Sequence, residues 1–309
     1  MTLLAPRLHI GDTIGIFTPS GEIDDSPSES PYEELEKGTR FLEKLGFKVV
    51  LGENALKRGA FGAGTPQERA DDINHMFANP DIHALISSHG GINANSILPY
   101  LDYDLIRRNP KILLGFSDVS TLHLGIYSQT GLVTFHGNMV IWYFGMDPQE
   151  YDRQEFLDRL VTGKIGPVNK HSEWRTVRGE KSAEGKLLGG NDWVMSWLLG
   201  TPYFPDMSDS ILFIEIPGFA PGSFYNRLTQ FKQAGIFEKV RGVLIGFANE
   251  KDGYKAEDIF LEVTAEYDFP IVKTDDFGHH CPNTTLPVGA RCRLDPASAR
   301  LEILEACVK

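Results

Sequence analysis

The first half of the chain alternates short apolar runs with segments whose apolar residues recur at helical spacing. Nearly continuous apolar runs predict buried strands at 9–18, 47–51, 82–88, 112–116 and 132–135. Other segments predict helices with one apolar face, at 33–45, 67–77 and 119–128. Buried strands that alternate with amphipathic helices indicate a parallel sheet covered on both faces. We therefore expect an α/β domain over 1–165.

The second half has a different pattern. Residues 166–184 are mostly polar, contain glycines and lack periodicity, which predicts a linker or an active-site loop. Beyond them, helices are expected near 192–199 and 222–234. Strand-like runs occur at 186–188, 211–216, 240–247, 271–272, 292–294 and 301–304. We predict a smaller, strand-rich α+β domain over 185–309.

Charge and composition narrow the choice of partners. The formal net charge is −12 and no Lys/Arg run stands out, which argues against nucleic acid, although a local pocket could still hold a small nucleotide. No apolar run approaches the roughly 20 residues that cross a bilayer. The first residues also lack the basic flank and apolar core of a secretory signal. A cytoplasmic protein without membrane contact is expected.

The cysteines suggest the same compartment. Cys281, Cys292 and Cys307 are odd in number and form no C-x-x-C pair. A disulfide framework is therefore not expected, which agrees with a reducing compartment.

A serine stands where a predicted buried strand meets a predicted helix, in the segment KILLGFSDVS that ends at Ser120. At such a turn the Ser117 hydroxyl is lifted clear of the sheet, and the next N–H can stabilise an oxyanion. The alternative is that Ser117 only caps the helix. The segment also departs from the G-x-S-x-G pattern, because Val119 stands where that pattern has its second glycine.

Paired glycines, Gly90 and Gly91, follow another predicted strand in the segment SSHGGINAN that ends at Asn95. Glycines let a backbone approach a ligand closely and expose its N–H groups, so this turn could supply a second oxyanion donor. An ordinary tight turn is the alternative. The segment is not a dinucleotide fingerprint, because G-x-G-x-x-G is absent.

A carboxylate and two adjacent histidines complete the candidate chemistry. Glu215 interrupts the apolar strand ILFIEI and should be paired or stand in a site, because burying a lone charge is costly. His279 and His280 lie in a Gly/Pro-rich loop between strands, and Glu215 could orient such a base. A structural ion pair for Glu215 and plain surface histidines are the alternatives.

Two other readings of the histidine loop stay open from the residues alone. His279, His280 and Cys281 could bind zinc, although adjacent residues rarely share one ion and no second ligand cluster is apparent. Cys281 could itself be a nucleophile. We expect no metal and no organic cofactor. A serine enzyme on an α/β scaffold is the interpretation that uses most of these features.

Several segments resemble the LD-carboxypeptidase family of serine peptidases, and most of all its microcin C self-immunity branch. They occur in the family's order over nearly the whole chain, at 64–74, 90–95, 98–106, 115–118, 131–137, 185–191, 211–215, 277–279 and 286–289. The resemblance implies a Rossmann-like N-terminal domain, a smaller C-terminal domain and a catalytic triad across their cleft. It also makes a homodimer plausible.

Carried over motif by motif, the resemblance implies Ser117 as nucleophile, Glu215 as acid and His279 as base, with His280 as second choice. The backbone N–H groups of Gly91 and Asp118 would then form the oxyanion hole. No cofactor is implied.

The family divides by substrate. One branch trims the terminal D-alanine from murein tetrapeptides, and the other cleaves the bond between an aminoacyl or peptidyl group and a modified adenylate. The turn with Gly90 and Asn93 looks more like the second branch, so both residues are candidates for substrate binding. In that branch an aromatic residue stacks on the adenine; Trp174 could do so, or could simply pack at the domain junction. A non-catalytic nucleotide or peptide binder, or a structural scaffold, is the rival from another class.

Overall fold

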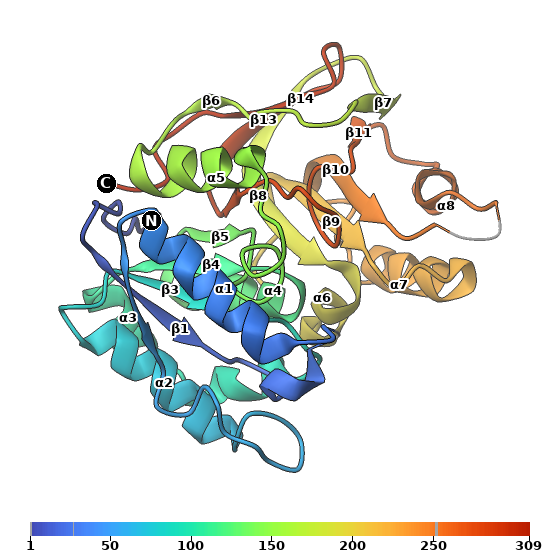
Figure 1. Cartoon of the computed structure of the whole chain (residues 1–309). Coiled ribbons are helices and arrows are strands. Elements are labelled where there is room, and N and C mark those ends of the chain that lie inside the picture. The colour runs from blue at the N-terminus through green and yellow to red at the C-terminus, as the bar shows by residue number, and fades with distance from the viewer. Residues whose placement is uncertain (1, 27, 251–252) are drawn as a thin grey trace.

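The computed structural model describes residues 2–26, 28–250 and 253–309. Two sheets lie side by side with helices around them (Figure 1). Within these ranges the first sheet has six strands in the order β12-β5-β4-β3-β1-β2. The second has eight, in the order β6-β14-β13-β8-β9-β10-β11-β7. The predicted fold class, a parallel sheet with a second strand-rich unit, is confirmed.

The first sheet is built from the apolar runs of the first half. Neighbouring strands from β1 to β5 pair in parallel. The side chains of β1, β3, β4 and β5 are almost all buried because helices cover the sheet, whereas the edge strand β2 is largely exposed. The strands are β1 (Thr13–Phe17), β2 (Lys48–Leu51), β3 (Ala84–Ser87), β4 (Ile112–Gly115), β5 (Thr134–His136) and β12 (Leu286–Val288). The helices of this half are α1 (Pro31–Lys44), α2 (Pro66–Ala78), α3 (Tyr103–Arg108) and α4 (Ser120–Thr130).

The second sheet mixes parallel and antiparallel pairs. Its parallel centre runs from β8 to β11, and antiparallel strands flank it on both sides. The strands are β6 (Gly166–Pro167), β7 (Arg175–Arg178), β8 (Ala183–Asn191), β9 (Ser210–Ile216), β10 (Val240–Ala248), β11 (Ile271–Lys273), β13 (Arg291–Asp295) and β14 (Arg300–Ile303). The helices are α5 (Glu150–Phe156), α6 (Asp192–Leu198), α7 (Pro221–Gln233) and α8 (Ala256–Val263).

Local signals explain where helices begin. At the start of α2, the Thr65 hydroxyl accepts a hydrogen bond from the Glu68 N–H at 3.2 Å, and the Glu68 carboxylate accepts one from the Thr65 N–H at 2.8 Å. Pro66 follows at the first helical position, where a missing N–H costs nothing. The cap therefore fixes how the chain enters the helix from the loop before it.

Contacts between the two halves are extensive. Helix α4 contacts α6 and β8, so it lies at the junction of the sheets. Strand β12, from late in the chain, pairs antiparallel with β5 and thereby joins the first sheet. Strands β6 and β7, from the segment predicted as a linker, pair with β14 and β11. The chain ends lie close together (Figure 1), and the Lys309 N–H donates to the Ala5 carbonyl at 2.9 Å.

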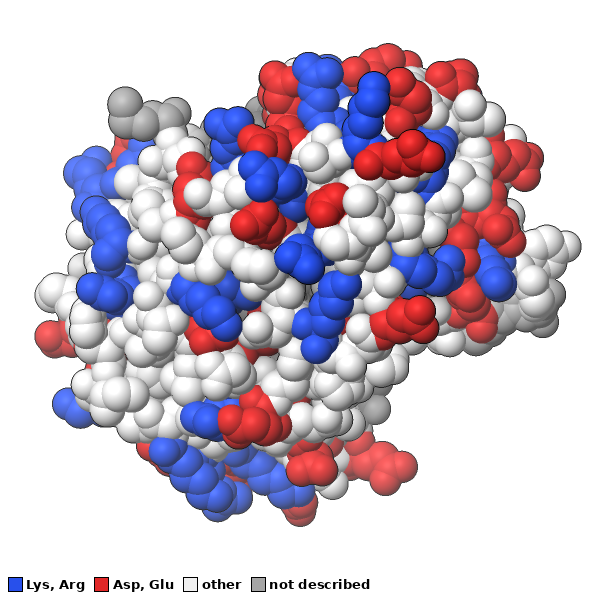
Figure 2. All heavy atoms as spheres, turned by 90° about the horizontal axis from the view of Figure 1, so that it is seen from above, with Lys and Arg blue, Asp and Glu red and all other residues white. Residues whose placement is uncertain are grey.

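One face of the molecule carries charged side chains of both signs. Figure 2 shows basic side chains interleaved with acidic ones over much of the face seen from above. No helix in the described part of the chain is both long and apolar enough to cross a membrane.

Candidate active site

Ser117 stands on a strained turn directly after β4. Its φ is +59°, a left-handed conformation that costs a non-glycine residue about 1–3 kcal/mol and that surrounding structure must hold in place. A short 3-10 turn, Ser117–Val119, leads from it into α4. The hydroxyl caps neither this turn nor α4. It points instead to an imidazole from the other half of the chain.

Three side chains far apart in the sequence meet at this turn. His279 Nε2 lies 3.1 Å from the Ser117 hydroxyl oxygen, and His279 Nδ1 lies 2.7 Å from Glu215 Oε2. The same carboxylate oxygen accepts the backbone N–H of His279 at 2.9 Å. With Nδ1–H donating to Glu215, Nε2 is left as an acceptor for the serine proton. This is the relay that serine-dependent hydrolases use.

The loop that carries His279 is held from several sides. Gly278 has φ +107°, and a Cβ there would lie 2.4 Å from Glu215 Oε2, so a side chain would displace the carboxylate. The Gly278 N–H donates to Asn283 Oδ1 at 3.0 Å, and its carbonyl accepts from the Tyr143 hydroxyl at 3.0 Å. The imidazole is therefore positioned by the backbone as well as by its own hydrogen bonds.

Glu215 is fully buried at the end of β9. Burial alone would raise the pKa of its carboxyl, but the charge and hydrogen bonds of His279 outweigh burial and hold the pKa below its usual range. Asn191 Nδ2 approaches the other carboxylate oxygen at 3.5 Å. Glu215 thus stays ionised and can stabilise a positive charge on His279.

The glycine turn after β3 packs beside Ser117. Gly91 has φ +148°, and a Cβ there would lie 2.2 Å from the Ser20 hydroxyl oxygen, so the position needs glycine. The Asp118 carboxylate accepts the Ala94 N–H at 2.8 Å and fixes the end of the turn. Among the described residues, the N–H groups of Gly91 and Asp118 have no acceptor. Two free donors beside a nucleophile are what an oxyanion requires.

A cavity of about 230 Å³ opens at these groups. Ser117, His279, Gly90 and Gly91 line it, and all four were proposed for the site in the sequence analysis. The structure adds residues that the sequence did not point to: Gly21, Asp25, His89, Met139 and Trp142. Only His89 had a visible signal, its place directly before the paired glycines. The Trp142 ring stands edge-on to the His279 ring at 6.0 Å.

Two of the expected substrate-binding residues lie elsewhere. Trp174 is 5% exposed and its indole N–H donates to Asp276 at 2.6 Å, so it packs between loops and does not line the cavity. Asn93 also lies outside the cavity lining. Its side-chain oxygen accepts from Ser20 at 2.9 Å and from Arg69 at 2.6 Å, which braces the glycine turn from behind.

The rival uses of the histidine loop find no matching geometry. In the described ranges, no group of three or more His, Cys, Asp or Glu side chains is placed to hold one metal ion. His280 packs against Phe247 at 5.4 Å between ring centres and does not line the cavity. Desolvation, and then the charges of Asp152 and Asp147, raise the pKa of the Cys281 thiol to about 11, which disfavours the thiolate a nucleophile needs.

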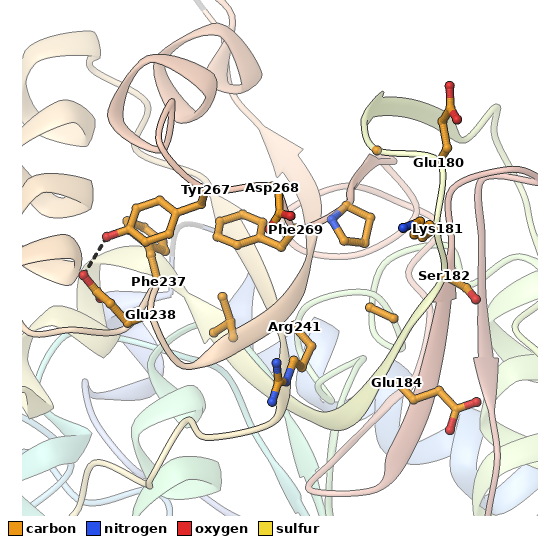
Figure 3. A pocket seen from close by; sticks show the side chains of 14 residues that line it. Glu180, Lys181, Ser182, Glu184, Phe237, Glu238, Arg241, Tyr267, Asp268 and Phe269 are labelled. Atoms are coloured by element: carbon orange, nitrogen blue, oxygen red, sulfur yellow. Dashed lines mark hydrogen bonds between the residues drawn. The ribbon is translucent and has the colours of Figure 1, made fainter.

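A larger hollow lies away from these groups. It is an open groove of about 800 Å³, lined by the segment that joins β7 to β8 and by the start of β10 (Figure 3). Its side chains are aromatic and charged, and the Tyr267 hydroxyl donates to Glu238 at 2.7 Å. Among the described residues that line the groove, no nucleophile is hydrogen-bonded to a base. Size alone therefore does not mark the site, whereas the convergence of Ser117, His279 and Glu215 does.

The fold and the relatives of this chain are those of a hydrolase of the peptidase class with two domains of mixed α and β structure. Two family models match the chain: the LD-carboxypeptidase N-terminal domain over residues 14–137 and the LD-carboxypeptidase C-terminal domain over residues 184–294. The chain belongs to the LD-carboxypeptidase family.

Two kinds of relative have similar sequence identity to this chain. The microcin C7 self-immunity protein MccF of Escherichia coli is 30% identical over 98% of this chain and 96% of its own length. A probable murein peptide carboxypeptidase of Bacillus subtilis is 31% identical over 97% of this chain and 94% of its own. The structure of MccF in complex with aspartyl sulfamoyl adenosine matches with a TM-score of 0.91 at 30% identity, over 99% of this chain and 100% of that one.

Proposed function

We propose that this protein is a serine hydrolase that cleaves the amide-type bond joining an aminoacyl or peptidyl group to an adenylate-like nucleotide. The observation that carries the proposal is the relay from Glu215 through His279 to Ser117, with distances of 2.7 and 3.1 Å. Ser117 is the nucleophile, His279 the general base and Glu215 the residue that orients and charges the base.

The reaction follows from these positions. His279 Nε2 takes the Ser117 proton as the hydroxyl oxygen attacks the carbonyl carbon. The N–H groups of Gly91 and Asp118 hold the resulting oxyanion. His279 then gives its proton to the leaving nitrogen, the carbon–nitrogen bond breaks and an acyl-enzyme forms. Water, activated by the same imidazole, releases the acid and restores Ser117.

The nucleotide part of the proposal rests on two supports. A structural relative with the same fold has been solved with aspartyl sulfamoyl adenosine bound. In this chain Trp142 lines the cavity beside His279 and offers an aromatic side chain to the substrate. Trp142 therefore replaces Trp174 as the candidate for contact with the base.

Release of D-alanine from murein tetrapeptides is the second candidate, since a murein peptide carboxypeptidase is about as similar in sequence. An enzyme that selects a terminal carboxylate would normally meet it with a cationic side chain. Among the described residues, no Lys or Arg lines the cavity, and Asp25 brings a negative charge to it. The residues that line the cavity therefore offer the D-alanine carboxylate no cationic partner.

The test compares hydrolysis of aspartyl sulfamoyl adenosine and of a murein tetrapeptide by the wild type and by Ser117→Ala. We expect the adenylate analogue to be cleaved, and the variant to lose roughly 10⁴- to 10⁶-fold in kcat. Faster cleavage of the tetrapeptide would move the proposal to the second candidate. Unchanged turnover by Ser117→Ala would refute the assignment of Ser117 as the nucleophile.

A fluorophosphonate label separates this proposal from a non-catalytic binder. Such a reagent should modify Ser117 in the wild type and nothing in Ser117→Ala, because only an activated serine reacts. We also propose, on the family resemblance, a homodimer in the cytoplasm. Light scattering of the purified protein tests the dimer, and a mass of one chain would refute it.

A further inference from the structure

A chain of hydrogen bonds fixes the proton on a buried histidine beside the nucleophile. The Thr18 hydroxyl donates to the Ala55 carbonyl at 2.8 Å, so its oxygen must accept at its 2.9 Å contact with Ser88. The Ser88 hydroxyl therefore donates its proton to the Thr18 oxygen. At its 3.0 Å contact with His89 Nδ1 the Ser88 oxygen can only accept. His89 therefore carries its proton on Nδ1, and Nε2 is a bare acceptor.

This acceptor has nothing to accept from within the described chain. His89 lines the cavity together with Ser117, and only 3% of its surface is exposed. Its Nε2 has no hydrogen-bond partner among the described residues. Burial lowers the pKa of its imidazole to about 4, so the ring is neutral near pH 7. A buried polar atom without a partner is costly, so a donor from a ligand would be favourable there.

A second acceptor lines the same cavity. It is the carboxylate of Asp25, whose negative charge opposes the effect of burial on the pKa of His89. Asp25 Oδ2 accepts the Glu22 N–H at 2.9 Å, which holds this loop against the cavity. In the described part of the chain, Asp25 takes part in no ion pair, and no Lys or Arg lines the cavity.

We propose that His89 Nε2 and the Asp25 carboxylate form a subsite for a protonated amino group on the acyl part of the substrate. An ammonium group brings several N–H donors and a positive charge, and so matches a group of acceptors that includes a carboxylate. The inference rests on the serine-hydrolase function proposed above and names the acyl group that function selects.

The position of the subsite indicates an α-amino group. His89 directly precedes Gly90 and Gly91, whose turn would hold the carbonyl oxygen of the substrate. In an aminoacyl group the α-nitrogen is two bonds from the carbonyl carbon, at about 2.5 Å. A cavity of about 230 Å³ keeps both groups close to the nucleophile. The site therefore selects an aminoacyl group with a free amine over an N-acylated one.

Activated esters test the acyl preference without involving the nucleotide. We would measure kcat/KM for alanine p-nitrophenyl ester and for N-acetylalanine p-nitrophenyl ester, below about pH 7, where an ordinary α-amino group is protonated. We expect the wild type to prefer the free amine by roughly 10- to 100-fold, the usual value of a charged hydrogen bond.

Variants assign the preference to the subsite. In Asp25→Asn and in His89→Phe the ratio of the two kcat/KM values should fall towards one, and His89→Gln, which restores an acceptor oxygen, should recover part of it. Asp24→Asn is the matched control, because Asp24 is also exposed on this loop but pairs with Arg58 and does not line the cavity. Its ratio should equal that of the wild type. If the buried His89→Phe variant fails to fold, the exposed Asp25 still allows the test.

Each outcome has a distinct meaning. Equal rates for the two esters in the wild type, or a ratio that survives in Asp25→Asn, would overturn the amine subsite and leave the serine-hydrolase function standing. If the protein hydrolyses neither ester and a fluorophosphonate does not label Ser117, the serine-hydrolase function is refuted, and the subsite with it.

Discussion

Replacing Glu215 by glutamine removes one charge from the site and keeps its shape. The amide oxygen should take the place of Oε2, because that oxygen accepts two N–H groups of His279, at 2.7 and 2.9 Å. The amide nitrogen then takes the place of Oε1, beside the Asn191 amide. The proton on His279 stays on Nδ1, so Nε2 remains able to act as base. What is lost is the attraction between a carboxylate and the imidazolium of the transition state.

The size of this loss follows from the burial of the pair. Two unit charges about 4 Å apart attract by about 4 kcal/mol at an effective dielectric constant near 20, and a neutral hydrogen bond recovers part of that. We expect kcat to fall about 10²- to 10³-fold. Stability should fall slightly, because the surroundings of the buried Glu215 hold its pKa below the usual value and so favour the carboxylate over a neutral group.

The assay pairs turnover of aspartyl sulfamoyl adenosine with thermal unfolding of the same preparations. Asp192→Asn would be a poor control because Asp192 is buried and pairs with Arg227, so Glu180→Gln, at an exposed residue outside the cavity, serves instead. If the Glu215→Gln variant keeps kcat within about threefold of the wild type, an electrostatic role for Glu215 is refuted. A collapse of Tm together with activity would mean that the carboxylate is structural.

Three further predictions concern neighbouring groups. Ser117→Gly should abolish fluorophosphonate labelling yet raise the free energy of unfolding by about 1 kcal/mol, because glycine relieves the strain at φ +59°; a fall in stability would contradict that strain. Cys281→Ser should retain wild-type kcat, since the thiol has a raised pKa and lies outside the cavity; loss of turnover would revive the cysteine as a nucleophile. Asp192→Ala should lower the free energy of unfolding in urea by about 3–5 kcal/mol, because it leaves the guanidinium of Arg227 without its partner at 2.5 Å; a change below 1 kcal/mol would show that the pair is not needed.

The sequence predicted strands β1 to β5 of the first sheet and the central strands of the second, because their apolar runs can be recognised in the sequence alone. A strand covered on both faces must be apolar throughout, and such runs are visible without any partner. Strands β6, β7 and β12 were not predicted. Each has only two to four residues and exists through pairing with a distant strand, which local periodicity does not encode.

The same distinction applies to the site. Ser117, Glu215 and His279 were visible because each combines a reactive group with an unusual local setting, a turn, an apolar strand or a glycine loop. Asp25 and Trp142 carry no such mark and reach the cavity only through the fold. Trp174 had a suggestive place in a polar segment, but its N–H pairs with Asp276 and its ring is buried.

Strand β12 gives the enzyme a mechanical property. The loop that carries His279 begins at β11 in the second sheet and ends at β12 in the first. It is therefore anchored to both halves of the molecule. Ser117, the proposed nucleophile, follows β4 of the first sheet, and Glu215 lies in β9 of the second. Any slippage of the halves therefore stretches the proton relay before either core opens, and catalysis should fail at milder denaturant concentrations than those that unfold the molecule.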